Sequence, residues 1–86
     1  MKVENLISSR GNKVANQFEI YNNGAHYFQS YASIIVKIEN GKTYLDSKYW
    51  DYSKTTAKYR IQFLCESTKE TQSKIDSGEY TLTNLN

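Results

Sequence analysis

The residues that could support catalysis or metal binding are few and far apart in this sequence. His26 is the only histidine and Cys65 the only cysteine, so no site that needs two imidazoles or two thiolates can form within one chain. We expect His26 to be a partly exposed strand residue and Cys65 a half-buried structural thiol. Asp46 and Asp51 could hold a divalent cation, but the dense run of oxygen ligands typical of calcium loops is missing, and Asp51 suits a helix N-terminus equally well. The sequence therefore predicts a protein that is not an enzyme, with no catalytic residues, no metal site and no cofactor.

A segment rich in aromatic and basic residues carries the strongest functional signal. Residues 48–60 contain four large aromatic side chains, three of them between residues 49 and 52, and four basic ones. Aromatic rings stack on nucleic acid bases while Lys and Arg neutralise phosphates, so the segment could bind a nucleic acid or anchor in a protein pocket. The same aromatic rings could instead close one end of the core, with the lysines forming a solvated helix face. The predicted partner-binding residues are Tyr49, Trp50, Tyr52, Lys54, Lys58 and Arg60.

Alternating apolar and polar residues predict antiparallel strands in the first half of the chain. Phe18 and Ile20 alternate with polar neighbours, which would bury one face of a strand. The runs 22–24 and 40–41 combine Asn with Gly, and both residues tolerate the left-handed backbone of tight hairpin turns. We expect strands at residues 4–9, 14–21, 26–39 and 42–45, with a bulge or bend near Ala32 in the third.

The period changes after residue 45 and predicts two helices. Ser53 is a favourable N-cap, and Ala57, Ile61 and Leu64 follow one stripe of a helix that would end near Glu66. Tyr59 and Phe63 form a second apolar pair on another side of that helix. Ser67 and Glu70 have capping-box spacing for a second short helix that Gly78 would end.

These elements predict an α+β fold, a small antiparallel β-meander of three or four strands followed by two C-terminal helices packed on it. The segment from Tyr80 to Leu85 would dock as a last strand or an extended tail. A chain of 86 residues builds one core, so we expect a single domain, residues 1–86.

Charge and composition restrict the partners. The formal net charge of +2 is too small for autonomous nucleic acid binding unless basic residues cluster locally. The N-terminal residues lack the apolar stretch of a secretory signal, and no run approaches membrane-spanning length. A lone cysteine also fits a reducing compartment. We therefore expect an intracellular protein without a membrane partner.

Runs spread over the whole sequence also carry a resemblance. They are Tyr27–Tyr31, Ser33–Val36, Asn40–Lys42, Leu45–Asp46, Tyr49–Thr56, Lys58–Arg60 and Phe63–Leu64, with 68–71 and 78–80 in the tail. With this pattern the chain, from about residue 14 to 85, resembles a family of small bacteriophage-encoded proteins of uncharacterised function. The resemblance implies a viral protein that acts in the cytoplasm of a bacterial host.

Two hypotheses follow from these observations. The first is a non-enzymatic interaction protein that binds and inhibits a host protein or protein–nucleic acid complex, for example a defence or nucleic-acid-processing enzyme, in the manner of anti-CRISPR inhibitors. The second is a nucleic-acid-binding accessory protein that uses the aromatic and basic segment. A homodimer is a further alternative, because a short meander leaves an open edge strand that a second copy could pair.

Overall fold

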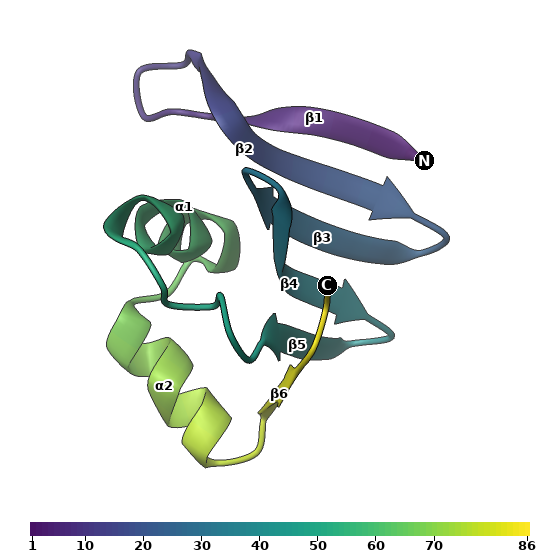
Figure 1. Ribbon diagram of the computed structural model, residues 1–86, viewed down its shortest axis with the longest axis vertical. Coiled ribbons are helices and arrows are strands. Elements are labelled where there is room, and N and C mark those ends of the chain that lie inside the picture. Colours follow the sequence, from purple (N-terminus) through teal and green to yellow (C-terminus); the bar gives the residue numbers. More distant parts are fainter.

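The computed structural model describes residues 1–86 and contains one six-stranded sheet with two helices (Figure 1). The first five strands form an antiparallel meander, and after the two helices the last strand pairs in parallel with the fifth. The sheet order is therefore the order of the chain. The elements are β1 (Lys2–Ile7), β2 (Lys13–Asn22), β3 (Ala25–Ser30), β4 (Ser33–Glu39), β5 (Lys42–Asp46), α1 (Lys54–Leu64), α2 (Thr68–Asp76) and β6 (Tyr80–Thr83).

The predicted α+β fold, a sheet followed by two helices, is confirmed, but the sheet has six strands and not three or four. One reason is that residues 26–39 form two strands. Tyr31 has a left-handed backbone (φ 55°), and its N–H donates to the carbonyl of Asn16 at 2.7 Å. The chain reverses there, where we expected only a bulge. The bulge is nearby, at Ile35, which is skipped in the pairing of β3 with β4. The other reason is β6, which joins the sheet as a full strand.

The two Asn-Gly turns form as their sequence predicts. Asn23 and Gly24 have φ values of 52° and 81°, and Asn40 and Gly41 have 53° and 74°. Two successive positive φ values define the tight turn that matches the twist of antiparallel strands. These two turns set the registers of β2 with β3 and of β4 with β5.

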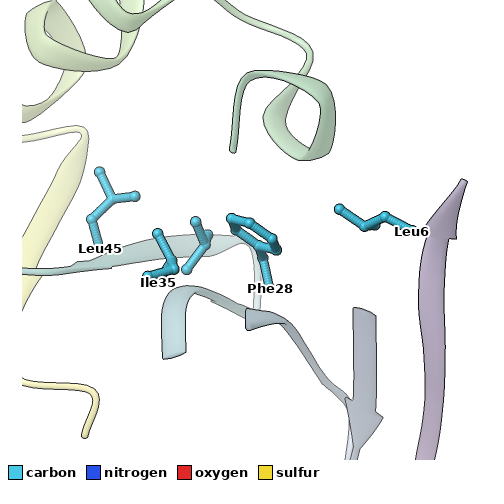
Figure 2. Close-up of a cluster of buried hydrophobic side chains, with 5 residues drawn as sticks. Leu6, Phe28, Ile35 and Leu45 are labelled. Atoms are coloured by element: carbon cyan, nitrogen blue, oxygen red, sulfur yellow. The ribbon is translucent and has the colours of Figure 1, made fainter. Parts of the chain in front are cut away.

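Both helices pack on the same side of the sheet and cover the hydrophobic core (Figure 1). Figure 2 shows Leu6, Phe28, Ile35 and Leu45 projecting from the strands into the space below the helices. Val36 completes this buried cluster. The partly buried residues packed against it are Ile38, Tyr49, Trp50, Tyr59, Phe63, Leu64, Ile75 and Tyr80.

The prediction of which side of α1 is buried is wrong. Its fully buried residues are Thr56 and Arg60, whereas Ile61 is 38% exposed. The polar pair can be buried because it is hydrogen-bonded: the hydroxyl of Thr56 lies 3.0 Å from that of Ser30 on β3. A stripe inferred from apolar residues alone misses a buried face that carries satisfied polar groups.

The predicted inner face of β2 is also reversed. Phe18 pairs with Gln29 and Ile20 with Tyr27, on the side of the sheet away from the helices, and both are only half-buried. Gln17 instead faces the helices, 1% exposed, although neither polar atom of its side-chain amide has a hydrogen-bond partner. The sheet thus has a covered face and an uncovered one, which we call the open face.

Candidate binding surface

A single row of side chains crosses the open face through all six strands. Each member lies directly opposite the next on the neighbouring strand, and residues directly opposite in a sheet point to the same side. From β1 to β6 the row is Val3, Ile20, Tyr27, Lys37, Tyr44 and Thr81. Phe18 lies beside it, two residues before Ile20 on β2. The row is therefore aromatic or aliphatic on β1, β2, β3 and β5, with a lysine on β4 and a threonine on β6.

Near the middle of the row, Lys37 lies between two aromatic rings. The ammonium nitrogen of Lys37 lies 5.9 Å from the ring centroids of both Tyr27 and Tyr44. Cations at this distance are attracted to the negative face of an aromatic ring. The same nitrogen lies 3.3 Å from a carboxylate oxygen of Glu39, so its charge is also neutralised within the sheet. The centre of the open face is consequently polarised but nearly uncharged.

The sequence of β3 contains a signal for this surface. β3 places Phe28 in the core and the adjacent Tyr27 on the open face, so the strand is aromatic on both sides. A strand with large side chains on both faces predicts cover on both faces. Here the helices cover only one face.

The structure divides the predicted binding segment between the interior and the surface. Tyr49 and Trp50 are half-buried and pack against the core, so they do close one end of it. Arg60 is completely buried, with its guanidinium carbon 5.1 Å from the centroid of the Trp50 ring. These three side chains are held inside and do not form an exposed aromatic and basic patch.

Arg60 links three parts of the chain through its guanidinium group. Its Nε donates to the carbonyl of Trp50 at 2.8 Å, and its Nη2 donates to Asp51 at 3.1 Å and to the hydroxyl of Thr68 at 3.0 Å. Nη1 has no partner. Burial lowers the pKa of Arg60, and the adjacent Asp51 carboxylate opposes this effect. The residue joins the loop before α1 to the start of α2 and has a structural role.

Tyr52, Lys54 and Lys58 are the predicted site residues that remain exposed. Tyr52 is 60% exposed, and its ring meets that of Tyr49 edge-on at 5.3 Å. Ser53 caps α1 by accepting from the N–H of Thr56 at 3.1 Å. A shallow hollow of about 290 Å³ is lined by Asp51, Tyr52, Ser53, Lys54 and Ala57. This second, smaller surface lies at the start of α1.

Asp46, considered from the sequence as a cation ligand, instead binds the backbone. Its Oδ2 accepts from the N–H groups of Lys48 and Tyr49, and its Oδ1 accepts from the N–H of Leu85 and the side-chain amide of Asn86. Burial acts to raise the pKa of Asp46, but these hydrogen bonds outweigh it and hold the pKa below the usual value of an aspartate. The carboxylate fastens the C-terminal residues to the end of β5.

A second buried carboxylate, Glu66, was not found from the sequence. It accepts from the hydroxyl of Thr71 at 2.9 Å and pairs with the ammonium of Lys74 at 2.7 Å. Burial acts to raise the pKa of Glu66, yet the hydrogen bonds, led by that of Lys74, lower it, and the same hydrogen bond raises the pKa of Lys74. The eight-residue separation of the pair is not a helical neighbour spacing, so no local pattern marks it.

His26 and Cys65 take ordinary structural positions. His26 is a half-buried strand residue, as expected, with Nε2 3.1 Å from a Glu19 carboxylate oxygen and its ring between those of Tyr21 and Phe63. The expectation of a half-buried Cys65 is wrong, because it ends α1 in a left-handed conformation (φ 57°) that exposes it. No three side chains of the His, Cys, Asp and Glu types are grouped so that they could hold a metal ion. None of the helices has the length and apolar character needed to cross a bilayer.

The fold and this surface define a small α+β domain whose sheet is covered by helices on one face only. The chain belongs to a protein family of unknown function, DUF8033, whose profile matches residues 1–79. No significant match was found among curated proteins or among solved structures.

Proposed function

We propose that this protein is a non-enzymatic interaction protein that binds a macromolecule through the open face. The observation that supports this proposal is the row from Val3 to Thr81, whose aromatic and aliphatic side chains are only half-buried in the isolated chain. A contiguous apolar surface on a small protein marks an interaction site more often than a lone exposed residue does.

The chemistry of the open face favours a protein partner. Interface centres are rich in Tyr and Phe and poor in unpaired charge. The open face has Phe18, Tyr27 and Tyr44, and its central lysine is matched by Glu39 at 3.3 Å. A polyanion would instead require several unpaired cations to replace its counterions.

The sequence pattern supports a proposal about the class of partner. The resemblance to small bacteriophage-encoded proteins supports a target in the bacterial host, and we extend the proposal to inhibition of a host defence or nucleic-acid-processing enzyme in the host cytoplasm. Inhibition would result when the open face covers a surface that the enzyme needs for its own substrate.

A second candidate function, nucleic acid binding, is supported by the start of α1. Tyr52 is well exposed and lines the same hollow as Lys54. Lys58 is exposed one turn further along α1, and the first turn of this helix contains no acidic residue. The positive end of a helix, a free ring and two ammonium groups together favour a phosphate with an adjacent base. With Arg60 buried, this surface has fewer cations than the sequence indicated.

The test is quantitative capture of proteins from a bacterial lysate with immobilised wild-type protein and two matched variants. Tyr27→Ala/Tyr44→Ala removes two rings from the open face, and Tyr31→Ala/Tyr52→Ala removes two exposed rings elsewhere. We expect a partner that the wild type and the second variant retain and the first variant loses at least tenfold, with all three equally folded by circular dichroism. Equal retention by both variants would contradict the proposal.

Fluorescence anisotropy with single-stranded oligonucleotides tests the second candidate function. Binding at low salt that weakens as salt rises, and that is lost in Lys54→Ala/Lys58→Ala but kept in Tyr27→Ala/Tyr44→Ala, would establish it. No binding at low salt would exclude it.

A further inference from the structure

The free edge of the sheet at β1 is available for pairing with another strand. β1 is the first strand in the sheet order and pairs only with β2, and Figure 1 shows no element along its outer side. An edge strand presents unpaired N–H and C=O groups in the geometry that a further strand requires. The opposite edge, β6, is shorter, with four residues against six in β1.

An acidic residue of β1 lies opposite another acidic residue on β2. Glu4 lies directly opposite Glu19, and like charges in this position are unfavourable. Glu19 has His26 as a partner at 3.1 Å, whereas the only partner of Glu4 is Lys2 of its own strand, at 3.1 Å and well exposed. On its free side, Glu4 lacks the opposing cation that a neighbouring strand would supply.

We propose that two copies of this chain form a homodimer by antiparallel pairing of β1 with β1, centred on Val3. Around a twofold axis at Val3, Lys2 of each copy lies opposite Glu4 of the other, which gives two reciprocal ion pairs. An axis centred on Lys2 or on Glu4 would place like charges opposite each other. The sequence of β1 is therefore self-complementary in this register, as a symmetric interface requires.

The same register extends the open face. Val3 is 51% exposed and would lie opposite Val3 of the second copy, a β-branched pair of the kind that stabilises neighbouring strands. The two rows of the open face would then run without interruption through both six-stranded sheets. The inference does not depend on what the open face binds, since it rests on the edge strand alone.

Sedimentation equilibrium on the full chain tests this inference, at concentrations up to about 1 mM because an interface of two short strands is small. Lys2→Glu places like charges opposite each other in both pairs, and the exchange Lys2→Glu/Glu4→Lys restores opposite charges. Lys69→Glu, on the exposed side of α2, is a control with the same change in net charge. Thermal unfolding of each variant confirms that it is folded.

We expect the wild type and Lys69→Glu to dimerise equally, Lys2→Glu to weaken dimerisation about tenfold, and the exchange variant to recover most of that loss. Hydrogen exchange of β1 amides should slow as the wild-type concentration rises. A wild type that is monomeric at every concentration would overturn the inference. So would a dimer that Lys2→Glu leaves unchanged, or that the exchange variant does not restore.

Discussion

Polar and charged residues make up about half of the buried residues of this protein. Of its buried residues six are hydrophobic and seven are polar or charged, so the apolar core is small for the size of the sheet. Arg60, Asp46 and Glu66 are each buried with hydrogen-bond partners on other segments of the chain. Removing one partner of such a group leaves the other buried and unsatisfied, which costs more than the bond itself contributes.

Replacing the guanidinium of Arg60 should therefore destabilise the fold strongly. Arg60→Lys keeps the charge, but a single ammonium cannot reach Trp50, Asp51 and Thr68 together. We expect the free energy of unfolding to fall by about 2–4 kcal/mol. Urea unfolding of Arg60→Lys and of Lys58→Ala, an exposed control on the same helix, measures this. Equal effects of the two substitutions would show that the buried network contributes little.

Asp46 should make the stability depend on pH in the acid range. Because its pKa is lower in the folded chain than in the unfolded one, its contribution is complete above the unfolded value of about 4 and is lost as the pH falls through the folded value. Asp46→Asn loses acceptors for backbone N–H groups, and we expect it to lower the free energy of unfolding by about 2–3 kcal/mol at pH 7.

The difference between the wild type and Asp46→Asn should shrink as the pH is lowered below about 4. Denaturant unfolding between pH 7 and pH 2.5 measures it, with Asp76→Asn, an exposed carboxylate on α2, as the control. A difference that stays constant over this range would contradict the role given to the Asp46 carboxylate.

At the scale of the elements, the sequence predicts what depends on local chemistry. The capping box of Ser67 and Glu70 starts α2 as expected, and the Asn-Gly turns form with positive φ values. The face that each element buries depends on the rest of the chain and is predicted less well. α1 buries Thr56 and Arg60 because Ser30, Asp51 and Thr68 supply their hydrogen-bond partners, and these three residues lie outside the helix.

For the candidate site too, local sequence predicts less well which side chains are buried. Of the residues that type and spacing singled out, Tyr52, Lys54 and Lys58 lie exposed near the start of α1, and their role in binding stays a prediction. Nothing local indicates that the neighbouring Trp50 turns inward to cover Arg60. The open face is a property of pairing across strands, since Tyr27, Lys37 and Tyr44 become neighbours only when β3, β4 and β5 are in register.

For the molecule as a whole, helices on one side only divide the sheet into two energetically different faces. Ile34 and Ile35 are consecutive on β4, but Ile34 lies opposite Gln29 on the open face and Ile35 is in the core. We expect Ile35→Ala to lower the free energy of unfolding by about 2–5 kcal/mol, and Ile34→Ala by less than half of that. Thermal and urea unfolding of the two variants measures this difference. Similar losses would mean that the open face is covered in solution.

The parallel pairing of β6 with β5 has a consequence for the order in which the chain folds. The strands β1 to β5 are joined by short turns, so each can pair with its predecessor as soon as both exist, and local pairing of this kind is fast. β6 can pair only after both helices have brought its end of the chain back to β5. Asn86, just after this strand, is hydrogen-bonded to Ile34 and Asp46. We therefore expect the last strand and these contacts to form at the end of folding and to detach first when the fold is disturbed.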